Sequence, residues 1–501
     1  MLRYSKFLLI LFLIAFIVKS FITMSSVPLH DFDEANRSEA ARNMKKYSFF
    51  LAPLNGSPFE KGFNLKIPAK SNPLLSLNYH LERPPLYYLS MIASTSLLGE
   101  NEFAFRLPSF IFGVAVVLIF FVLGWSLFPS LAILTSSDWW LSSQSALMDT
   151  ALSFFLFLSF LFLVDFLKSR RAVRLIFSGA FLGLAILSKG QPAVVFVFPL
   201  IFLIVTRRLS FKELVIFSLS AGVVLLPEAV PLIGKFGVHK LFYTLSDFSS
   251  RRTVVADPTQ SAPFFWYFRW WLGSFRIGLI LFLTLFLSDL KTRNFSLPKL
   301  LSLSYIVPSF VLFSVSKNKV WWYVLPLIPV VCYYIFLSVK KEKWLNLSVI
   351  TFISAVPVFS TSSNKVALLW GVVLLVVSYF VYNLKLNLKN SFATTVIVFS
   401  LIFSLSIFFY FFPVISPTYP ETVEVGEYYQ KLPQPKCLFV LNMPYEAILF
   451  YSKAEAVEYF GKKPLLKGCS NYLVTPDKKP ELKLLHRSNR LFLYRLPATT
   501  R

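Results

Sequence analysis

Carboxylates that could act as general bases stand where apolar segments of this chain end. Asp33 and Glu34 follow the first apolar segment, and Asp149 begins a later one. A carboxylate in such a place can accept a proton from a hydroxyl group, or bind a metal ion or a sugar hydroxyl. Helix capping is the alternative, because acids also favour the first turn of a helix. The position of Asp149 favours the catalytic interpretation, since ionisable residues at membrane depth are usually functional.

Cations stand near the same ends of the apolar segments. Lys189 closes one segment, Arg251 lies in the loop 233–262, and Lys317 precedes an aromatic run at 321–323. Taken singly, Lys189 could simply extend its ammonium group toward water, and the aromatic run is typical of an interfacial belt. Together, cations around carboxylates indicate an anionic ligand, most naturally a phosphate.

A rigid turn is predicted at Glu82-Arg83-Pro84-Pro85. Two prolines fix an extended backbone ahead of a helix, so the turn would hold the side chains of Glu82 and Arg83 in place. The alternative is an ordinary proline start to a surface helix.

The composition is that of a membrane protein with many spans. Of the 501 residues, 56% are hydrophobic and 18% are aromatic, which exceeds what a soluble domain can bury. The formal charge of +25 does not indicate nucleic-acid binding, because the cations lie in short clusters between apolar spans. Such clusters set topology and contact phospholipids.

We predict an all-α polytopic membrane protein with about thirteen transmembrane helices. The spans are expected near 7–24, 105–128, 131–147, 150–167, 175–188, 191–206, 213–232, 263–288, 300–316, 320–339, 345–360, 366–384 and 391–412. Arg3 and Lys6 place the N-terminus in the cytoplasm, and each later basic cluster then falls on the cytoplasmic side. Asp33, Glu34, Glu82 and Asp149 then all fall on the outer side.

Two parts of the chain are expected outside the bundle. Residues 25–98 should form an outer loop with surface helices at 35–47 and 84–98, the second being too short to cross. The tail, 413–501, is less hydrophobic and alternates strand-like and helix-like runs, which predicts a small α/β domain. Residues 1–412 would then be the transmembrane domain. Cys437 and Cys469 could pair if the tail lies outside the cytoplasm.

These pieces, in this order, resemble the bacterial GT-C glycosyltransferases related to aminoarabinose transferase (ArnT) and protein O-mannosyltransferases. Counterparts of the family motifs are Asp33-Glu34-Ala35-Asn36-Arg37, Glu82-Arg83-Pro84-Pro85-Leu86, Glu102-Phe103-Ala104-Phe105-Arg106-Leu107-Pro108-Ser109, Met148-Asp149, Leu187-Ser188-Lys189-Gly190, and Ser316-Lys317-Asn318-Lys319 with Tyr323, Leu325-Pro326 and Pro329. The motifs cover about residues 1–330, and their order is more specific than any one of them.

The resemblance implies an enzyme of the cytoplasmic membrane that transfers a sugar from a polyprenyl phosphate at the outer, periplasmic face. Asp33 would be the central carboxylate, with Asp149 and Glu34 as the other catalytic candidates, and inversion is the expected stereochemistry. The implied substrate-binding residues are Arg37, Glu82, Arg83, Arg106, Lys189, Arg251, Lys317 and Tyr323. The favoured reaction moves an aminoarabinose-like sugar from undecaprenyl phosphate to lipid A or a related envelope glycolipid.

Several alternatives stay open. A protein acceptor, as in protein O-mannosyltransferases, fits the same motifs. A lipid transporter would place its charges at mid-bilayer in broken helices rather than at span ends. A non-catalytic scaffold would need no charged residues gathered at the span ends. A histidine found in ArnT relatives is absent from Asp247–Arg251. No cofactor is therefore assigned, and a divalent metal at Glu82 stays open.

Overall fold

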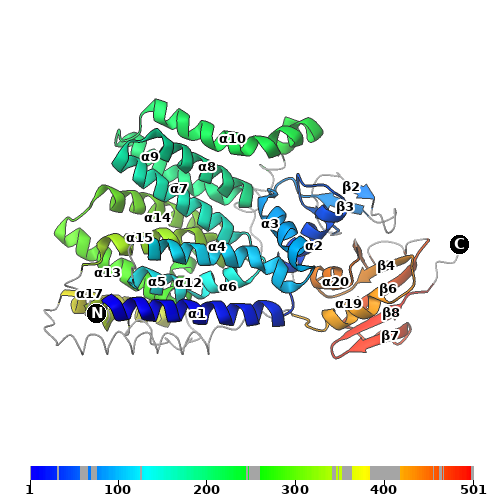
Figure 1. Cartoon of the computed structure of the whole chain (residues 1–501). Helices are drawn as coiled ribbons and strands as arrows, with labels where there is room; N and C mark the ends of the chain where they lie inside the picture. The colour runs from blue at the N-terminus through cyan, green and yellow to red at the C-terminus, as the bar shows by residue number, and fades with distance from the viewer. Residues whose placement is uncertain are drawn as a thin grey trace.

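A computed structural model of the chain describes most of its residues. The described ranges are 2–30, 33–56, 66–68, 76–123, 127–243, 246, 260–340, 346–347, 349–351, 364–383, 418–454, 456–461, 465 and 468–497. A bundle of long helices occupies one end of the molecule, and a smaller part containing strands occupies the other (Figure 1).

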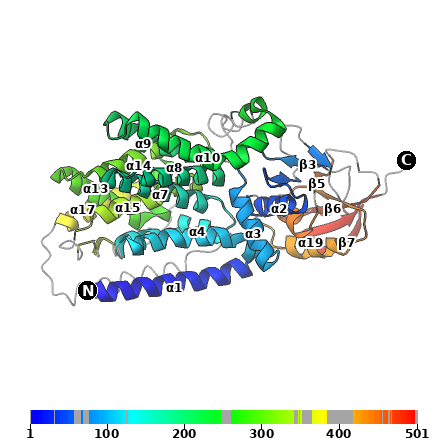
Figure 2. The ribbon, with the colours of Figure 1, turned by 45° about the horizontal axis from the view of Figure 1, so that its top comes forward.

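The bundle is built from helices that run along a shared direction, with α1 at one side and α10 at the other (Figures 1 and 2). Its elements are α1 (Leu2–Ser26), α4 (Glu102–Val122), α5 (Leu127–Leu134), α6 (Ser137–Gln144), α7 (Asp149–Ser169), α8 (Ala172–Lys189), η1 (Gln191–Phe196), α9 (Val197–Val205), α10 (Phe211–Phe236), α12 (Trp266–Ser274), α13 (Arg276–Thr292), α14 (Leu297–Val315), η2 (Trp321–Leu327), α15 (Ile328–Ser338) and α17 (Asn364–Asn383).

Within the described residues, 6 helices are long and apolar enough to cross a membrane, or 7 if the bent pair α12–α13 is one span. The chain is therefore an integral membrane protein with a mostly helical fold, as predicted. The expected number of thirteen spans stays a prediction, because the span near 391–412 and most of the one near 345–360 lie outside the described residues.

Two predicted spans are not single straight helices. The span predicted at 131–147 breaks between α5 and α6, where the Ser136 side chain caps α6 by accepting from the Trp139 N–H. The span predicted at 263–288 bends by 112° between α12 and α13. Asp138 in α6 joins these two irregular regions, because it accepts hydrogen bonds from Trp270 Nε1 at 3.0 Å and Ser274 Oγ at 2.7 Å.

The close packing of α8 on α10 depends on two glycines. A Cβ on Gly179 would lie 2.3 Å from the Phe217 carbonyl oxygen, and one on Gly183 would lie 2.8 Å from the Ala221 carbonyl oxygen. Glycines four residues apart let two membrane helices approach backbone to backbone. This contact holds α10, whose opposite face is exposed and apolar, against the bundle.

Beyond one end of the bundle lie α2 (Asp33–Lys46), α3 (Leu86–Leu98) and a sheet with strand order β1-β3-β2, made of β1 (Leu54–Asn55), β2 (Lys66–Pro68) and β3 (Ser76–Tyr79). The helices expected on the membrane surface at 35–47 and 84–98 are thus present. Most of the first of these helices, α2, is buried between the bundle and the C-terminal part (Figure 1), and its position along the membrane interface stays a prediction.

The C-terminal part is a five-stranded mixed sheet with two helices. Its strands are ordered β5-β4-β6-β8-β7, with β4 parallel to β5 and β6, and β8 antiparallel to β6 and β7. The elements are α19 (Thr422–Gln430), β4 (Lys436–Val440), α20 (Glu446–Tyr451), β5 (Val457–Tyr459), β6 (Ser470–Thr475), β7 (Lys483–Ser488) and β8 (Leu491–Arg495). Cys437 and Cys469 form a disulfide beside the paired strands β4 and β6. The predicted α/β tail is present.

Burial of α2 leaves one carboxyl group in an apolar setting. Glu39 is fully buried, and that burial raises its pKa to about 8, although Arg42, the Gly56 N–H and the Asn43 amide favour the ionised form. The folded pKa lies above the unfolded one, so the stabilisation that the protonated group contributes is lost as the pH rises through the folded pKa.

We expect Glu39→Gln to remove part of the pH dependence of stability. The wild-type melting temperature should fall from about pH 5 to about pH 9 as Glu39 loses its proton, whereas the variant should fall less. Melting temperatures of the purified protein in detergent measure this. Glu427→Gln, an exposed glutamate in α19, is the control and should follow the wild type. Equal slopes for Glu39→Gln and wild type would contradict the prediction.

Candidate active site

A buried ion pair holds the segment that carries the first two carboxylates. Arg106 of α4 donates from Nε to Glu34 Oε1 at 2.7 Å and from Nη2 to Oε2 at 2.8 Å. Its remaining donor capacity goes to the carbonyls of Met24, Val27 and Pro28, at 3.1, 2.6 and 3.0 Å. The guanidinium therefore ties the end of α1 and the start of α2 to α4.

Glu34 is fully used by this network. It also accepts from the backbone N–H groups of His30 and Ala146, each at 2.8 Å. Burial alone would raise the pKa of the Glu34 carboxyl, but Arg106 and these two N–H groups outweigh it and hold the pKa below its ordinary value. With Arg106 and Glu34 at 0% and 2% exposure, neither side chain has room to touch a substrate. Both are better placed to position their neighbours.

A second pair lies at the same end of the bundle. Asp149 begins α7 and Lys189 ends the neighbouring helix α8, so the hairpin brings the two side chains together, and they form an ion pair. The Lys189 ammonium also lies 5.6 Å from the ring centroid of Tyr323. Asp149 is only 1% exposed. Its carboxylate therefore orients Lys189 rather than facing open solvent.

Asp33 and Arg37 form a third pair, one turn apart on α2. Arg37 Nη2 lies 3.2 Å from Asp33 Oδ1, and the Asp33 side chain keeps 35% of its surface exposed. Arg37 is 4% exposed, and its Nε and Nη1 are buried without a hydrogen-bond partner. The charges of Asp33 and Arg37 act on Lys189, so these residues belong to one site. A buried guanidinium with unused donors is suited to an anionic ligand.

The turn predicted at Glu82-Arg83-Pro84-Pro85 lies against this site. His80 Nδ1 is 3.0 Å from Glu82 Oε1, and Arg83 Nη1 donates to Asn36 Oδ1 at 3.4 Å. Burial would raise the pKa of the Glu82 carboxyl, but His80 and Arg83 lower it to about 2, so the group is ionised at neutral pH.

Gly190 brings this turn next to Lys189. Its φ is +77°, and an added Cβ would lie 3.4 Å from Pro84 Cγ. A side chain at this position would be strained by the backbone conformation, whereas its Cβ would only touch the proline. The glycine that follows Lys189 therefore allows the backbone conformation with which the end of α8 meets the turn.

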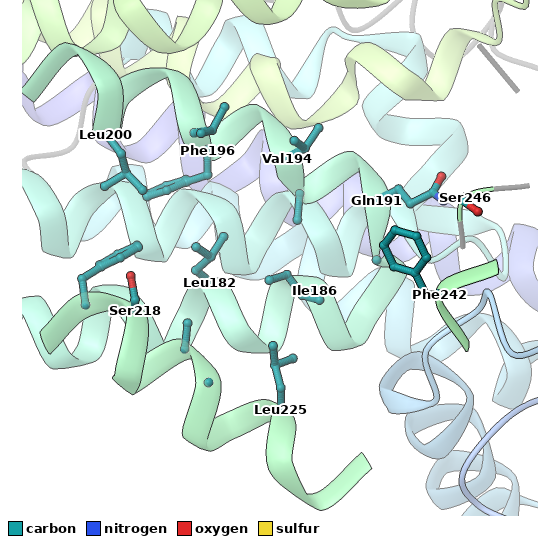
Figure 3. Close-up of a pocket in the computed structure, with 16 residues that line it drawn as sticks. Leu182, Ile186, Gln191, Val194, Phe196, Leu200, Ser218, Leu225, Phe242 and Ser246 are labelled. Carbon is teal, nitrogen blue, oxygen red and sulfur yellow. The ribbon is translucent and has the colours of Figure 1, made fainter. Parts of the chain in front are cut away.

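An apolar groove of about 770 Å³ begins beside Lys189. It lies between α8, η1, α9 and α10, and Gln191, Phe242 and Ser246 are grouped at one end of it (Figure 3). The long part of the groove is lined by Leu182, Ile186, Val194, Phe196, Leu200 and Leu225. A groove of this kind suits a hydrocarbon chain whose polar end lies near Lys189 and Arg37.

Two of the predicted site residues are not among the groups described above. Arg251 lies outside the described residues. Lys317 is exposed, whereas its neighbour Lys319 is buried and donates to the carbonyls of Ala262 and Ser316, at 2.8 and 2.6 Å. The sequence analysis did not single out His80, although its spacing of two residues from Glu82 was visible. No group of three His, Cys, Asp or Glu side chains suited to a metal occurs among the residues whose placement is described.

Comparisons with known proteins agree with this arrangement. Residues 82–233 match the model of the dolichyl-phosphate-mannose-protein mannosyltransferase family. A crystal structure of ArnT from Cupriavidus metallidurans bound to undecaprenyl phosphate superimposes with a TM-score of 0.66, at 17% identity, over 98% of each chain. The apo structure of the same protein gives 0.65 at 17% identity over 97% of each chain. The fold is ArnT-like. No curated protein matches the chain in sequence.

The predicted resemblance is therefore confirmed. The matched segment is that of a glycosyltransferase family, and it contains Glu82, Arg106, Asp149 and Lys189. The solved structures add that the fold is ArnT-like over nearly the whole chain. Asp33 and Arg37 lie ahead of the matched segment and enter the site through the fold.

We expect Arg106→Gln to destabilise the protein severely. Removing one partner of a buried ion pair leaves Glu34 charged and unpaired, which costs roughly 3–5 kcal/mol. The free energy of unfolding in detergent, or the yield of folded protein, measures the loss. Arg174→Gln is the matched control, because its pair with Asp165 is exposed and should contribute under about 1 kcal/mol. Similar losses in both variants would contradict the structural role of Arg106.

Proposed function

We propose that this protein is a glycosyltransferase of the cytoplasmic membrane that takes its sugar from a polyprenyl phosphate. The observation that supports this most directly is the position of two cations: Arg37 is buried, and Lys189, whose side chain is 11% exposed, directly precedes Gly190 and Gln191 at one end of an apolar groove. Such a donor has an anionic head, which suits the two cations, and a long hydrocarbon tail, which suits the apolar groove. The ArnT structure that shares the fold was solved with undecaprenyl phosphate.

The proposed reaction proceeds by displacement at the anomeric carbon. The acceptor oxygen forms a bond to that carbon while the bond from carbon to the phosphate oxygen breaks, and the polyprenyl phosphate leaves with the electron pair. Arg37 and Lys189 would neutralise the charge that develops on the leaving phosphate, which is where fixed cations accelerate transfer most. One displacement on the face opposite the phosphate inverts the configuration.

Asp33 is the proposed general base. It is the carboxylate of this site that keeps a substantial exposed surface, while Glu34 and Asp149 are each committed to a buried cation. If the acceptor is a hydroxyl group, its proton passes to Asp33. An acceptor phosphate is already anionic and transfers no proton. Arg37, paired with Asp33, would link the base to the donor phosphate.

The remaining predicted residues receive supporting roles in this proposal. Glu82 and Arg83 would form the outer edge of the donor site, with Arg83 close enough to α2 to reach a phosphate oxygen. Glu34 and Arg106 would hold α2 in place, and Tyr323 would pack against Lys189. Arg251 and Lys317 stay candidates for attracting an anionic substrate from outside the bundle.

For the acceptor we propose lipid A or a related envelope glycolipid, with an aminoarabinose-like sugar as the group transferred at the periplasmic face. Arg42, Lys45 and Lys46 follow the base along α2, and the two lysines are exposed. Exposed cations next to a membrane attract anionic lipids. Transfer to a protein instead would appear as a sugar lost from an envelope protein.

We expect Asp33→Asn to reduce sugar transfer about 10²–10⁴-fold while leaving donor binding close to wild type. Arg37→Gln and Lys189→Gln should instead weaken binding of undecaprenyl phosphate about tenfold or more, because each removes a charge-assisted contact. Binding to the purified protein in nanodiscs and turnover in membranes measure the two effects. Lys212→Gln, an exposed lysine near the far end of α10, is the control.

Mass spectrometry of lipid A and envelope proteins, with and without this chain, identifies the acceptor. A sugar present on a glycolipid only when the chain is active supports the proposal. A sugar on a protein, with the glycolipids unchanged, would replace the lipid acceptor by a protein one. Unchanged transfer by Asp33→Asn would contradict the role of Asp33, and absence of undecaprenyl phosphate binding by the wild type would contradict the donor.

A further inference from the structure

The C-terminal domain reaches the site through one tyrosine. Tyr451, the last residue of α20, accepts a hydrogen bond from the Leu29 N–H at 2.7 Å and donates one to Glu102 Oε1 at 3.0 Å. Tyr451 and Leu29 are 8% and 0% exposed, so these bonds lie away from water. A residue far along the chain thus bridges the segment ahead of Asp33 and the start of α4.

A second contact fixes α20 on α2. Arg42 donates from Nη1 to the Phe450 carbonyl at 2.7 Å and from Nη2 to the Leu449 carbonyl at 3.3 Å. Its guanidinium carbon also lies 5.2 Å from the centre of the Phe450 ring. The carbonyls at the C-terminal end of a helix lack helical partners and carry partial negative charge, so a cation there is favourable.

The contacts of α20 within its own domain hold Tyr451 from the other side. Gln430 of α19 donates from Nε2 to the Tyr451 carbonyl at 2.7 Å. An added Cβ on Gly426 would lie 2.6 Å from the Tyr451 carbonyl carbon, so α19 packs directly against the end of α20. The position of the Tyr451 hydroxyl is therefore set by the folded domain.

The two groups that Tyr451 bridges belong to the frame that presents the proposed base. Leu29 precedes Asp33 by four residues, and the neighbouring Pro28 carbonyl is held by Arg106. Glu102 begins α4, one turn before Arg106. Tyr451 and Arg106 thus both hold the same short segment, at Leu29 and at Pro28.

We propose that Tyr451 is a positioning residue for Asp33, so that the C-terminal domain is part of the active site's architecture. The inference rests on the proposed function for the role of Asp33. The alternative is a domain that merely docks on the bundle, for which loss of one hydroxyl group would leave the segment at 28–37 unchanged.

The test compares Tyr451→Phe with wild type as full-length protein in nanodiscs. The variant keeps the ring and removes both hydrogen bonds, so hydrogen–deuterium exchange in residues 28–37 should become about tenfold faster, the factor that corresponds to a loss of about 1.4 kcal/mol. Arg42→Gln should act in the same direction. Tyr428→Phe is the control, because this tyrosine of α19 stacks on His486 within its own domain.

Activity gives an independent readout. We expect Tyr451→Phe to lower kcat for sugar transfer about tenfold, with a smaller change in the affinity for undecaprenyl phosphate, because Lys189 and the groove are untouched. Unchanged exchange in residues 28–37 and unchanged kcat in a folded Tyr451→Phe protein would overturn the inference. An equal fall in kcat for Tyr428→Phe would also overturn it, since domain stability would then be the cause. If wild type neither binds undecaprenyl phosphate nor transfers sugar, the proposed function fails, while the exchange experiment still decides whether Tyr451 positions the segment.

Discussion

The buried ion pair between Arg106 and Glu34 is the interaction on which the geometry of the site depends. The chain leaves α1, crosses the surface of the bundle and enters α2 within a few residues, and the carbonyls at the end of α1 have no helical partners there. The Arg106 guanidinium donates hydrogen bonds to the carbonyls of Met24, Val27 and Pro28 while it pairs with Glu34. Burial of two charges is unfavourable unless each remaining donor and acceptor is satisfied. Here the backbone N–H groups of His30 and Ala146 complete the set, so one arrangement of α1, α2 and α4 is strongly preferred.

With α1, α2 and α4 held in this arrangement, a group of charged side chains lies near an apolar groove. The end of the bundle gathers Asp33, Arg37, Asp149 and Lys189, whereas the groove beside it is lined almost entirely by carbon. Close packing at Gly179 and Gly183 holds α8 and α10, two of the helices that line the groove, against each other. Gly190 and Gln191, which follow Lys189 in the chain, line one end of the groove. A lipid-linked phosphate is suited to an apolar groove next to cations, because its tail is stable in an apolar environment and its charged head is stable beside cations.

Parts of the site come from segments far apart in the chain. Pro84 packs on Gly190, Arg83 reaches Asn36, and Tyr451 reaches Leu29. The bundle supplies Asp149 and Lys189, the outer helices supply Asp33 and Arg37, and the C-terminal domain holds the segment between them. A site assembled from three regions in this way is sensitive to changes well away from the reacting groups, since a displacement of about 1 Å lowers transfer rates greatly.

The sequence by itself indicated that the chain is a membrane protein, where most of the described helices lie, and several of the residues that meet at one end of the bundle, among them Asp33, Arg37, Asp149 and Lys189. Hydrophobic length and the positions of Lys, Arg and Pro carry that information because they act locally. The motif order also indicated the fold. Pattern alone was insufficient at Ser136 and Phe275, where apolar segments of sufficient length break. The Ser136 side chain caps α6, and Asp138 of α6 accepts hydrogen bonds from the Trp270 and Ser274 side chains of α12, a contact between distant segments that no local pattern contains.

Only the tertiary structure decided what each charged residue does. Asp33 and Glu34 are adjacent and chemically alike, and the sequence offered both as catalytic groups. Consecutive residues of a helix point about 100° apart. One carboxylate is therefore turned inward to Arg106 and enclosed, while the other keeps 35% of its side chain exposed beside Arg37. Pairing and burial depend on which distant segments pack around a residue, and no local pattern contains that information.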